Sequence, residues 1–371
     1  MLSKRQFLQA AGLTLASRIA APGAEPVEEA RKVIIVTFGG GVRYAETFAP
    51  EGVQNIPVLS QLRPQGRFFR DCRNNGVLSH FNSSASIVTG EWQRVDDFGF
   101  EPPASETVFE AFRRQRKVGP LDAWAVCTNK SFFTIGGAHP DYRANVILPK
   151  QLLLEAVKEI VNRPSGFGVA DRENVQRRLE TILQEGYEGI GWTIFKASRQ
   201  LDRHIRETLT RGLAAYIHGP EAPSSGDELT FFMTREIMRE FAPRLMLVNF
   251  WDMDVAHWGA YSLYLQAITR TDRLTGMLWE EIQSNPAYKD RTTLLILPEL
   301  GRDGDINTAN GFLNHRSGDA SCRNMWLLAL GAGVEPGESD QPVAHTQAAA
   351  TAARLLGVKL PSSTPPLPHI V

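Results

Sequence analysis

Cysteine is scarce in this sequence. The 371 residues include three cysteines, Cys72, Cys127 and Cys322, and no two of them form a Cys-x-x-Cys pair. This spacing argues against a structural zinc site built from thiolates. An odd number leaves at least one thiol unpaired, and a single disulfide cannot be assigned from the sequence. We interpret the three cysteines as small buried residues.

An excess of charge of either sign is also missing. The chain has 40 basic and 41 acidic residues, so its net charge does not favour binding to nucleic acid or to an anionic membrane surface. With 43% hydrophobic and 22% charged residues, the composition is that of a soluble globular protein. We therefore expect no nucleic-acid partner, and the sequence predicts no particular oligomeric state.

The N-terminal segment lacks an apolar run long enough for a stable membrane span. Residues 1–24 have a basic start, a modest apolar middle and small residues near the end, which are the parts of a secretory signal. Residues 3–8 (SKRQFL) resemble a twin-arginine export signal in which lysine replaces the first arginine. We expect residues 1–25 to be the export signal of a bacterial periplasmic or secreted protein. An amphipathic N-terminal helix is the alternative.

Apolar runs of strand length alternate with helical patterns along the rest of the chain. A continuous β-branched run that ends in glycines is typical of a parallel strand buried on both faces. The sequence therefore predicts an α/β fold with a layered, mostly parallel central sheet flanked by helices. We predict strands at 33–38, 68–73, 123–128, 245–248, 292–297 and 326–330, and helices at 57–62, 83–89, 108–117, 260–284 and 347–356.

Helical periodicity and charge spacing dominate residues 150–163 and 171–215. Residues 220–227, rich in proline, serine and glycine, follow as a loop. We predict one α/β domain over residues 26–371, with a helical cap or insertion at about 150–226.

Polar residues gather where the predicted strands begin or end. Asp254 and His257 follow the strand at 245–248, and His315 precedes the strand at 326–330. Strand ends in a parallel sheet meet at one edge, so we expect these side chains to share a pocket. Together the three would suit a divalent metal such as zinc. The alternative is that Asp254 caps a helix.

Two further groups of charged residues occupy strand ends. Glu299, Arg302 and Asp303 follow the strand at 292–297, and Arg43 follows the strand at 33–38. Arg43 and Arg302, with Arg316 before the strand at 326–330, could hold the phosphate or sulfate group of a substrate, and Asp303 is a further candidate for substrate binding. Alternatively, these residues form ordinary ion pairs, with Glu46 or Asp303 as the partner of an arginine.

The order of these motifs resembles the alkaline phosphatase superfamily, which includes phosphatases, sulfatases and phosphodiesterases. Residues 79–90 (SHFNSSASIVTG) resemble its nucleophile helix, and 254–259 (DVAHWG) resemble its Asp…His metal motif. Asn314-His315 resembles its late histidine ligand, and 343–358 resembles its C-terminal helix. The resemblance covers about 32–100 and 244–361. It implies a metal-dependent hydrolase of small anionic esters.

The chain departs from this superfamily at the parts that hold the nucleophile and its metal. Gly39 to Gly41 stand where the superfamily has a metal-binding aspartate, and His80 falls on the nucleophile position. Glu299-Leu300 replaces an Asp-His pair, and the spacing from Asp254 to His257 is one residue short. An uncharacterised branch of the superfamily, often exported by the twin-arginine route, shows similar glycine-rich first strands.

Three hypotheses follow. The protein hydrolyses phosphate or sulfate esters with one metal held by Asp254, His257 and His315, and with Ser79, Ser83 or water as the nucleophile. Alternatively, it is an inactive member that acts as a periplasmic binding or interaction protein. The third hypothesis is a different reaction in which His80 and Glu299 are catalytic and Asp303 takes part.

Overall fold

The strand β1 (Lys32–Phe38) lies at the centre of a ten-stranded sheet, because its two faces are both apolar. It pairs in parallel with β6 (Leu245–Phe250) on one side and with β7 (Thr292–Pro298) on the other. Every residue of the three strands is buried. The three predicted strands are therefore confirmed as the centre of the sheet.

The computed structural model describes residues 31–149, 173, 192–193, 207–208, 225–304 and 311–371. The predicted export signal at 1–25 and nearly all of the predicted insertion at about 150–226 lie outside these residues. Within the described part of the chain, no helix is both long enough and apolar enough to cross a membrane.

The sheet has the strand order β10-β2-β8-β7-β1-β6-β3-β4-β5, with β9 paired to β2. Its strands are mostly parallel, and β5 and β8 run antiparallel to their neighbours. The predicted α/β fold with a mostly parallel sheet is confirmed. The remaining strands are β2 (Arg67–Arg73), β3 (Ala123–Cys127), β4 (Asn145–Ile147), β5 (Trp192–Thr193), β8 (Asn324–Gly331), β9 (Gly337–Ser339) and β10 (Val343–Ala344).

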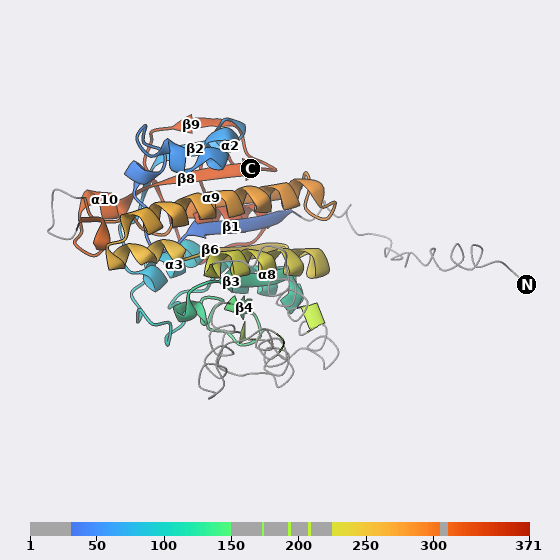
Figure 1. The fold of residues 1–371 in the computed structure, drawn as a ribbon. Coiled ribbons are helices and arrows are strands. Elements are labelled where there is room, and N and C mark those ends of the chain that lie inside the picture. Colours follow the sequence, from blue (N-terminus) through green and yellow to red (C-terminus); the bar gives the residue numbers. More distant parts are fainter. Residues whose placement is uncertain (1–30, 150–172, 174–191, 194–206, 209–224, 305–310) are drawn as a thin grey trace, which may run out of the picture. The chain divides into compact units, whose positions relative to one another are not determined.

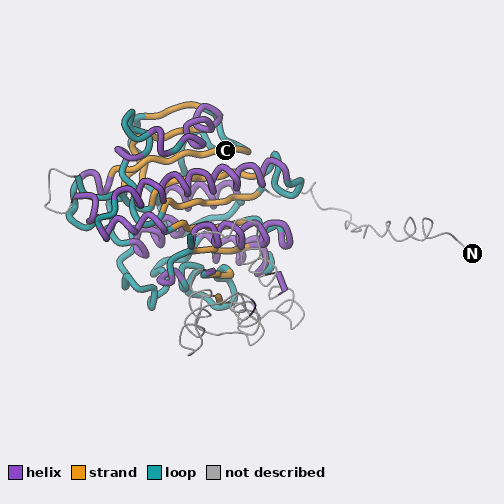
Figure 2. The backbone as a smooth tube through the Cα atoms, viewed as in Figure 1, coloured by secondary structure: helices purple, strands orange, loops and turns teal. Residues whose placement is uncertain are grey.

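Helices cover both faces of the sheet (Figures 1 and 2). Alternate residues of β1 face two separate cores: Ile34 and Val36 belong to one, and Val33 and Ile35 to the other. The first core includes side chains of α2 (Pro57–Leu62), α8 (Gly226–Phe241) and α9 (Tyr261–Ser284). The second includes side chains of α3 (His80–Thr89), α4 (Val108–Arg116) and α11 (Gln347–Leu355).

The short helix α10 (Ala320–Arg323) leads into β8, which runs antiparallel to β7. The prediction grouped the segment 314–319 with the other strand ends on the assumption of parallel pairing, and that assumption is wrong for β8. In a parallel strand the segment before the first residue would lie at the opposite edge. Because β8 is antiparallel, the segment reaches the edge where β1, β6 and β7 end.

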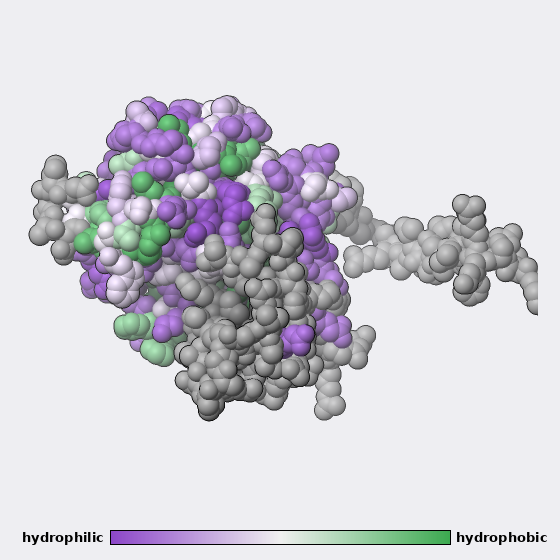
Figure 3. All heavy atoms as spheres, viewed as in Figure 1, coloured by the Kyte–Doolittle hydropathy of each residue, from purple (hydrophilic) through white to green (hydrophobic). Residues whose placement is uncertain are grey.

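The surface of the described residues in Figure 3 is mostly hydrophilic, with smaller hydrophobic groups between the polar ones. This distribution is that of an ordinary globular surface.

A buried carboxylate holds the start of α2. Asp272 of α9 is buried, and its two oxygens accept hydrogen bonds from the backbone amides of Val58 (2.9 Å) and Leu59 (2.8 Å). These amides have no partner within their own helix, since they lie in its first turn. Asp272 therefore caps α2 from a neighbouring helix, in the way that a local N-cap residue usually does.

Replacing Asp272 by alanine should lower the free energy of unfolding by about 1–3 kcal/mol, because two buried amides lose their acceptors. Urea denaturation at neutral pH would measure this loss. Asp272→Asn is the matched control, since it keeps one acceptor oxygen and should lose less. An unchanged urea midpoint in Asp272→Ala would show that the contact does not stabilise the fold.

Candidate metal centre

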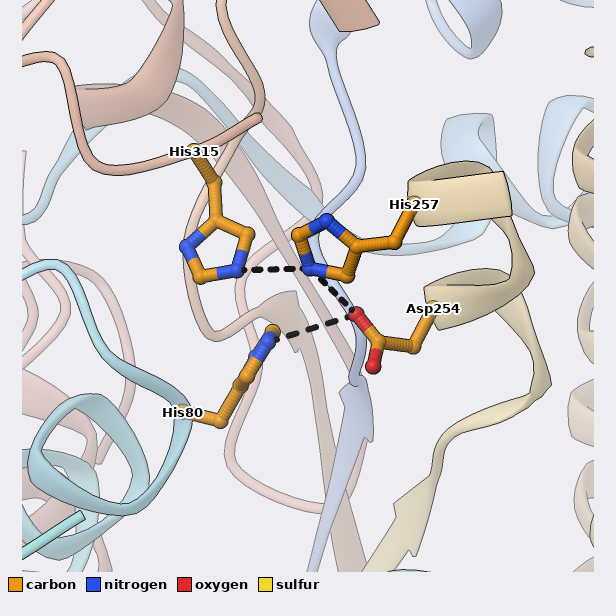
Figure 4. Close-up of side chains that lie close together, drawn as sticks. All are labelled: His80, Asp254, His257 and His315. Atoms are coloured by element: carbon orange, nitrogen blue, oxygen red, sulfur yellow. Dashed lines mark hydrogen bonds and ion pairs between the residues drawn. The ribbon is translucent and has the colours of Figure 1, made fainter. Parts of the chain in front are cut away.

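Four side chains of metal-ligand type meet at the edge of the sheet where β1, β6 and β7 end. They are His80, Asp254, His257 and His315, and one ligand atom from each lies within 4.8 Å of the others. Figure 4 shows the three imidazole rings and the carboxylate pointing toward a common centre. The structure therefore brings together the three residues predicted to bind metal, and adds His80 as a fourth.

The ligands come from three separate elements. His80 is the first residue of α3, and His315 follows the short 3₁₀ helix η7 (Gly311–Leu313). Asp254 and His257 lie in the 3₁₀ helix η6 (Asp252–Trp258), directly after β6. A 3₁₀ helix has three residues per turn, so residues three apart stack on one face. This geometry explains how an Asp-to-His spacing of three residues points both side chains to the same centre.

Three of the distances between the candidate ligand atoms are close to those around a tetrahedral ion. Nε2 of His257 is 3.1 Å from Oδ1 of Asp254 and 3.1 Å from Nε2 of His315. Nε2 of His80 is 3.4 Å from the same Asp254 oxygen. A tetrahedral zinc ion with bonds of about 2.0–2.1 Å would space its ligand atoms about 3.3 Å apart.

The other ring nitrogen of two histidines is hydrogen-bonded to a protein oxygen. Nδ1 of His80 lies 2.6 Å from Oε1 of Glu299, and Nδ1 of His315 lies 3.4 Å from the carbonyl of Leu78. These oxygens are acceptors, so each Nδ1 carries the proton, and each Nε2 keeps its lone pair for the centre. Nε2 of His80 is buried and faces Oδ1 of Asp254 at 3.4 Å.

Glu299, at the end of β7, supports the centre from behind. Its carboxylate is fully buried and also accepts hydrogen bonds from the amide of Gly40 (2.9 Å) and the hydroxyl of Ser84 (2.7 Å). The side chain thus fixes His80, the first turns of α3 and the chain after β1 at once. Its place behind His80 is that of a partner that orients a ligand.

Arg302 is fully buried and oriented by protein groups. It donates to Oδ1 of Asp254 (2.9 Å) and to the carbonyls of Gly40 and Gly41. It was predicted to bind the substrate anion. In the structure its guanidinium holds Asp254 and the glycine turn in place.

Burial and neighbouring charge set the protonation of these groups. Burial is the largest influence on Asp254 and raises its pKa, but hydrogen bonds from His257 and His80, with the charge of Arg302, lower it overall. Burial, followed by repulsion from His80, lowers the pKa of His315 to about 2. Burial also opposes charge on His80, yet Glu299 and Asp254 raise its pKa overall. In the centre, the Asp254 carboxylate is therefore ionised and the His315 imidazole is neutral, whereas the surroundings of His80 favour its positively charged form.

Two predicted substrate-binding residues lie outside the four-residue cluster. Nε of Arg43 donates to Glu46 at 2.9 Å, and its Nη1 donates to the carbonyl of Asp303 at 3.0 Å. The side chain of Asp303 is buried and accepts hydrogen bonds from Ser317 and Cys322. The pairing of Arg43 with Glu46, weighed as an alternative from the sequence, is the arrangement that the structure contains.

Asp227, in the first turn of α8, has a supporting role that sequence reasoning missed. Its buried carboxylate accepts hydrogen bonds from the amides of Trp251 (2.6 Å) and Asp252 (2.9 Å), where β6 passes into η6. Burial, followed by the charge of Asp252, raises its pKa to about 7. The sequence placed Asp227 at the end of a loop, and its only local signal was the preceding Ser225-Gly226, which is typical of a helix start.

No protein-family model and no curated protein matches this sequence. Solved structures match its fold. The alkaline phosphatase PafA is 13% identical, with a TM-score of 0.59 over 94% of this chain and 100% of that chain. A 2-O GAG sulfatase is 11% identical, with a TM-score of 0.51 over 91% of this chain and 73% of that chain. A protein in the alkaline phosphatase superfamily from Vibrio parahaemolyticus is 12% identical, with a TM-score of 0.50 over 88% and 67%.

The chain therefore has the alkaline phosphatase-like fold, and the predicted resemblance to this superfamily is confirmed at the level of fold. The low identities agree with the departures from the superfamily's motifs seen in the sequence. A shared fold does not by itself carry an activity, since function depends on the residues of the site.

The glycine turn after β1 should not tolerate a side chain. Gly40 has a φ of +86°, and a Cβ atom there would lie 2.5 Å from the amide nitrogen of Asp254. We expect Gly40→Ala to lower the free energy of unfolding by clearly more than the roughly 1 kcal/mol of backbone strain alone. Gly318→Ala is the control, because Gly318 has a φ of +83° with nothing within 4 Å. Equal losses in urea denaturation would contradict the proposed close contact with Asp254.

Proposed function

We propose that this protein binds one divalent metal ion through His80, Asp254, His257 and His315, and that a small phosphate or sulfate ester binds beside it. The observation that carries the proposal is the convergence of four ligand atoms at spacings of 3.1 to 3.4 Å between neighbours. The hydrogen bonds at Nδ1 of His80 and His315 support it, because they turn the lone pair of each Nε2 toward the centre.

Zinc is the ion that fits this set of donors best. Three imidazoles and one carboxylate are ligands of intermediate softness, and four of them complete a tetrahedral shell. When bound, the ion would supply positive charge that attracts the anionic group of the ester. The buried guanidinium of Arg302 donates to Oδ1 of Asp254 at 2.9 Å and so orients the carboxylate for this role.

Neither serine that was considered as a nucleophile points to the four-residue cluster in the described part of the chain. His80 stands at the position that the resemblance assigns to the nucleophile, and its Nε2 faces the ligands. The Ser79 hydroxyl accepts a hydrogen bond from Asn82, and the Ser83 hydroxyl accepts one from Asn74. Both serines are buried, and these bonds lie within α3 and the loop before it. We therefore favour metal-dependent binding of the ester over hydrolysis through a covalent intermediate.

Hydrolysis by water is the second candidate function, and one observation favours it. The side chain of His257 is 39% exposed, and a cavity of about 510 Å³ borders Asp254. Arg270 also borders this cavity. An ester and a water molecule could therefore reach the centre from solvent, which a purely structural metal site does not require.

Export to the bacterial periplasm is part of the proposal. Its support is the sequence of residues 1–25, with the basic start, apolar middle and small residues of a secretory signal.

Metal analysis of the purified protein tests the centre directly. We expect about one zinc per chain in the wild type and less than about a tenth of that in His257→Ala, because the shell loses one of four donors. His257 is the ligand of choice, because its side chain is 39% exposed and its truncation removes little buried packing. His139→Ala is the control, because His139 lies outside the cluster. A wild type without metal, or an unchanged zinc content in His257→Ala, would contradict the proposal.

Turnover separates the two candidate functions. The zinc-loaded protein should bind inorganic phosphate or sulfate more tightly than the same protein after its zinc has been removed by a chelator. If the function is binding, the zinc-loaded protein should hydrolyse 4-nitrophenyl phosphate and sulfate no faster than His257→Ala does. The measurements are calorimetric titration and release of 4-nitrophenol. Zinc-dependent turnover that disappears in His257→Ala would establish hydrolysis as the function instead.

A further inference from the structure

A second cavity, of about 540 Å³, is lined in part by Leu78 and Ser79, directly before His80 at the start of α3. We call it the arginine cavity; its lining includes Leu78, Trp92, Arg94, Asp97, Arg316 and Arg323. Two of its lining residues adjoin His315. The carbonyl of Leu78 accepts the hydrogen bond from His315, and Arg316 is the next residue in the chain.

The cavity has more positive charge than its own carboxylate can neutralise. Arg316 forms an ion pair with Asp97 at 3.2 Å. Arg323 donates to the neutral carbonyls of Asn74 (3.0 Å) and Gly76 (3.1 Å). Arg94 has neither an ion pair nor a hydrogen bond with any residue that the structure describes. Three guanidinium groups beside one carboxylate form a site of positive potential that attracts an anion.

An aromatic wall is held beside these arginines. Trp92 is 42% exposed, and its ring centroid lies 5.0 Å from that of the buried His345. The backbone of Gly76 lies directly against the indole, since a Cβ atom at Gly76 would come within 2.8 Å of it. Contacts with His345 and Gly76 thus fix the ring, which is a condition for stacking a planar or sugar ring on it at low entropic cost.

We propose that the arginine cavity binds the alcohol part of the ester, and that this part is a ring carrying a second anionic group. The ring packs on Trp92 while its anionic group pairs with Arg94 and Arg323. The ester group then lies toward His315 and the metal centre. This inference rests on the proposed function for the position of the ester group, and it narrows the ligand to ring-containing molecules with two anionic groups.

Calorimetric titration of the full-length protein tests the inference with three probes: inorganic phosphate, glucose 1,6-bisphosphate and adenosine 3′,5′-bisphosphate. We expect at least one of the two ring bisphosphates to bind the wild type about tenfold more tightly than phosphate does, or better. The sugar and the nucleoside probes show which kind of ring the cavity prefers. Similar affinities for all three probes would overturn the proposal.

Single substitutions locate the binding. Arg94→Gln and Trp92→Ala should each remove most of the advantage of the ring bisphosphate, and Trp92→Phe should restore part of it. Arg114→Gln is the charge-matched control, because Arg114 lies on α4 and pairs with Glu106 away from the cavity. An equal loss in Arg114→Gln, or no loss in Arg94→Gln, would overturn the proposal.

Zinc content, measured in the same samples, separates this inference from the proposed function. Arg94→Gln should keep the zinc content of the wild type, since Arg94 is not a ligand. A protein without zinc that still prefers the ring bisphosphate would contradict the metal centre and support the cavity. A zinc-loaded protein without that preference would support the metal centre and contradict the proposed role of the arginine cavity.

Discussion

The carboxylate of Glu299 joins the parts on which the centre depends. It lies at the end of β7, where it accepts hydrogen bonds from the chain after β1 and from the first and fifth residues of α3. A buried carboxylate is costly unless its oxygens are paired, and here three donors satisfy them. The position of His80 therefore follows from the end of a central strand rather than from α3 alone. Removing this one charge would leave an amide, an imidazole and a hydroxyl without their acceptor in the interior.

The positively charged side chain of Arg302 supports the centre from another side than the negatively charged Glu299. It holds Asp254 and the glycine carbonyls after β1, so Glu299 and Arg302 bind the same short turn from two sides. Both side chains are fully buried, where the low dielectric makes paired charges interact strongly and unpaired charges unfavourable. These two buried side chains thus hold the segments that bring three histidines and a carboxylate close together.

Much of this arrangement could be predicted from the sequence. The buried strands were evident because they are continuous apolar runs, and Asp254, His257 and His315 were evident because they stand at strand ends. The direction of β8 could not be predicted, because apolar periodicity is the same in parallel and antiparallel strands. The sequence placed His80 and Glu299 in one candidate site, but not as a metal-ligand position and its support, since the orientation of His80 depends on a contact with Glu299 more than 200 residues away in the chain. The spacing from Asp254 to His257 is one residue shorter than in the superfamily's motif, and the sequence did not predict the 3₁₀ helix η6 that places both side chains on one face.

The glycine turn after β1 limits which side chains can stand at the end of this strand. Where related proteins are expected to carry a metal-binding aspartate, the backbone of Gly40 and Gly41 takes a left-handed conformation and packs against Asp254, Leu300 and Gly301. An aspartate introduced there would find neither the conformation nor the space that it needs. The main chain itself therefore excludes a side chain at this position, and a single substitution to aspartate would not place a carboxylate there without moving the backbone.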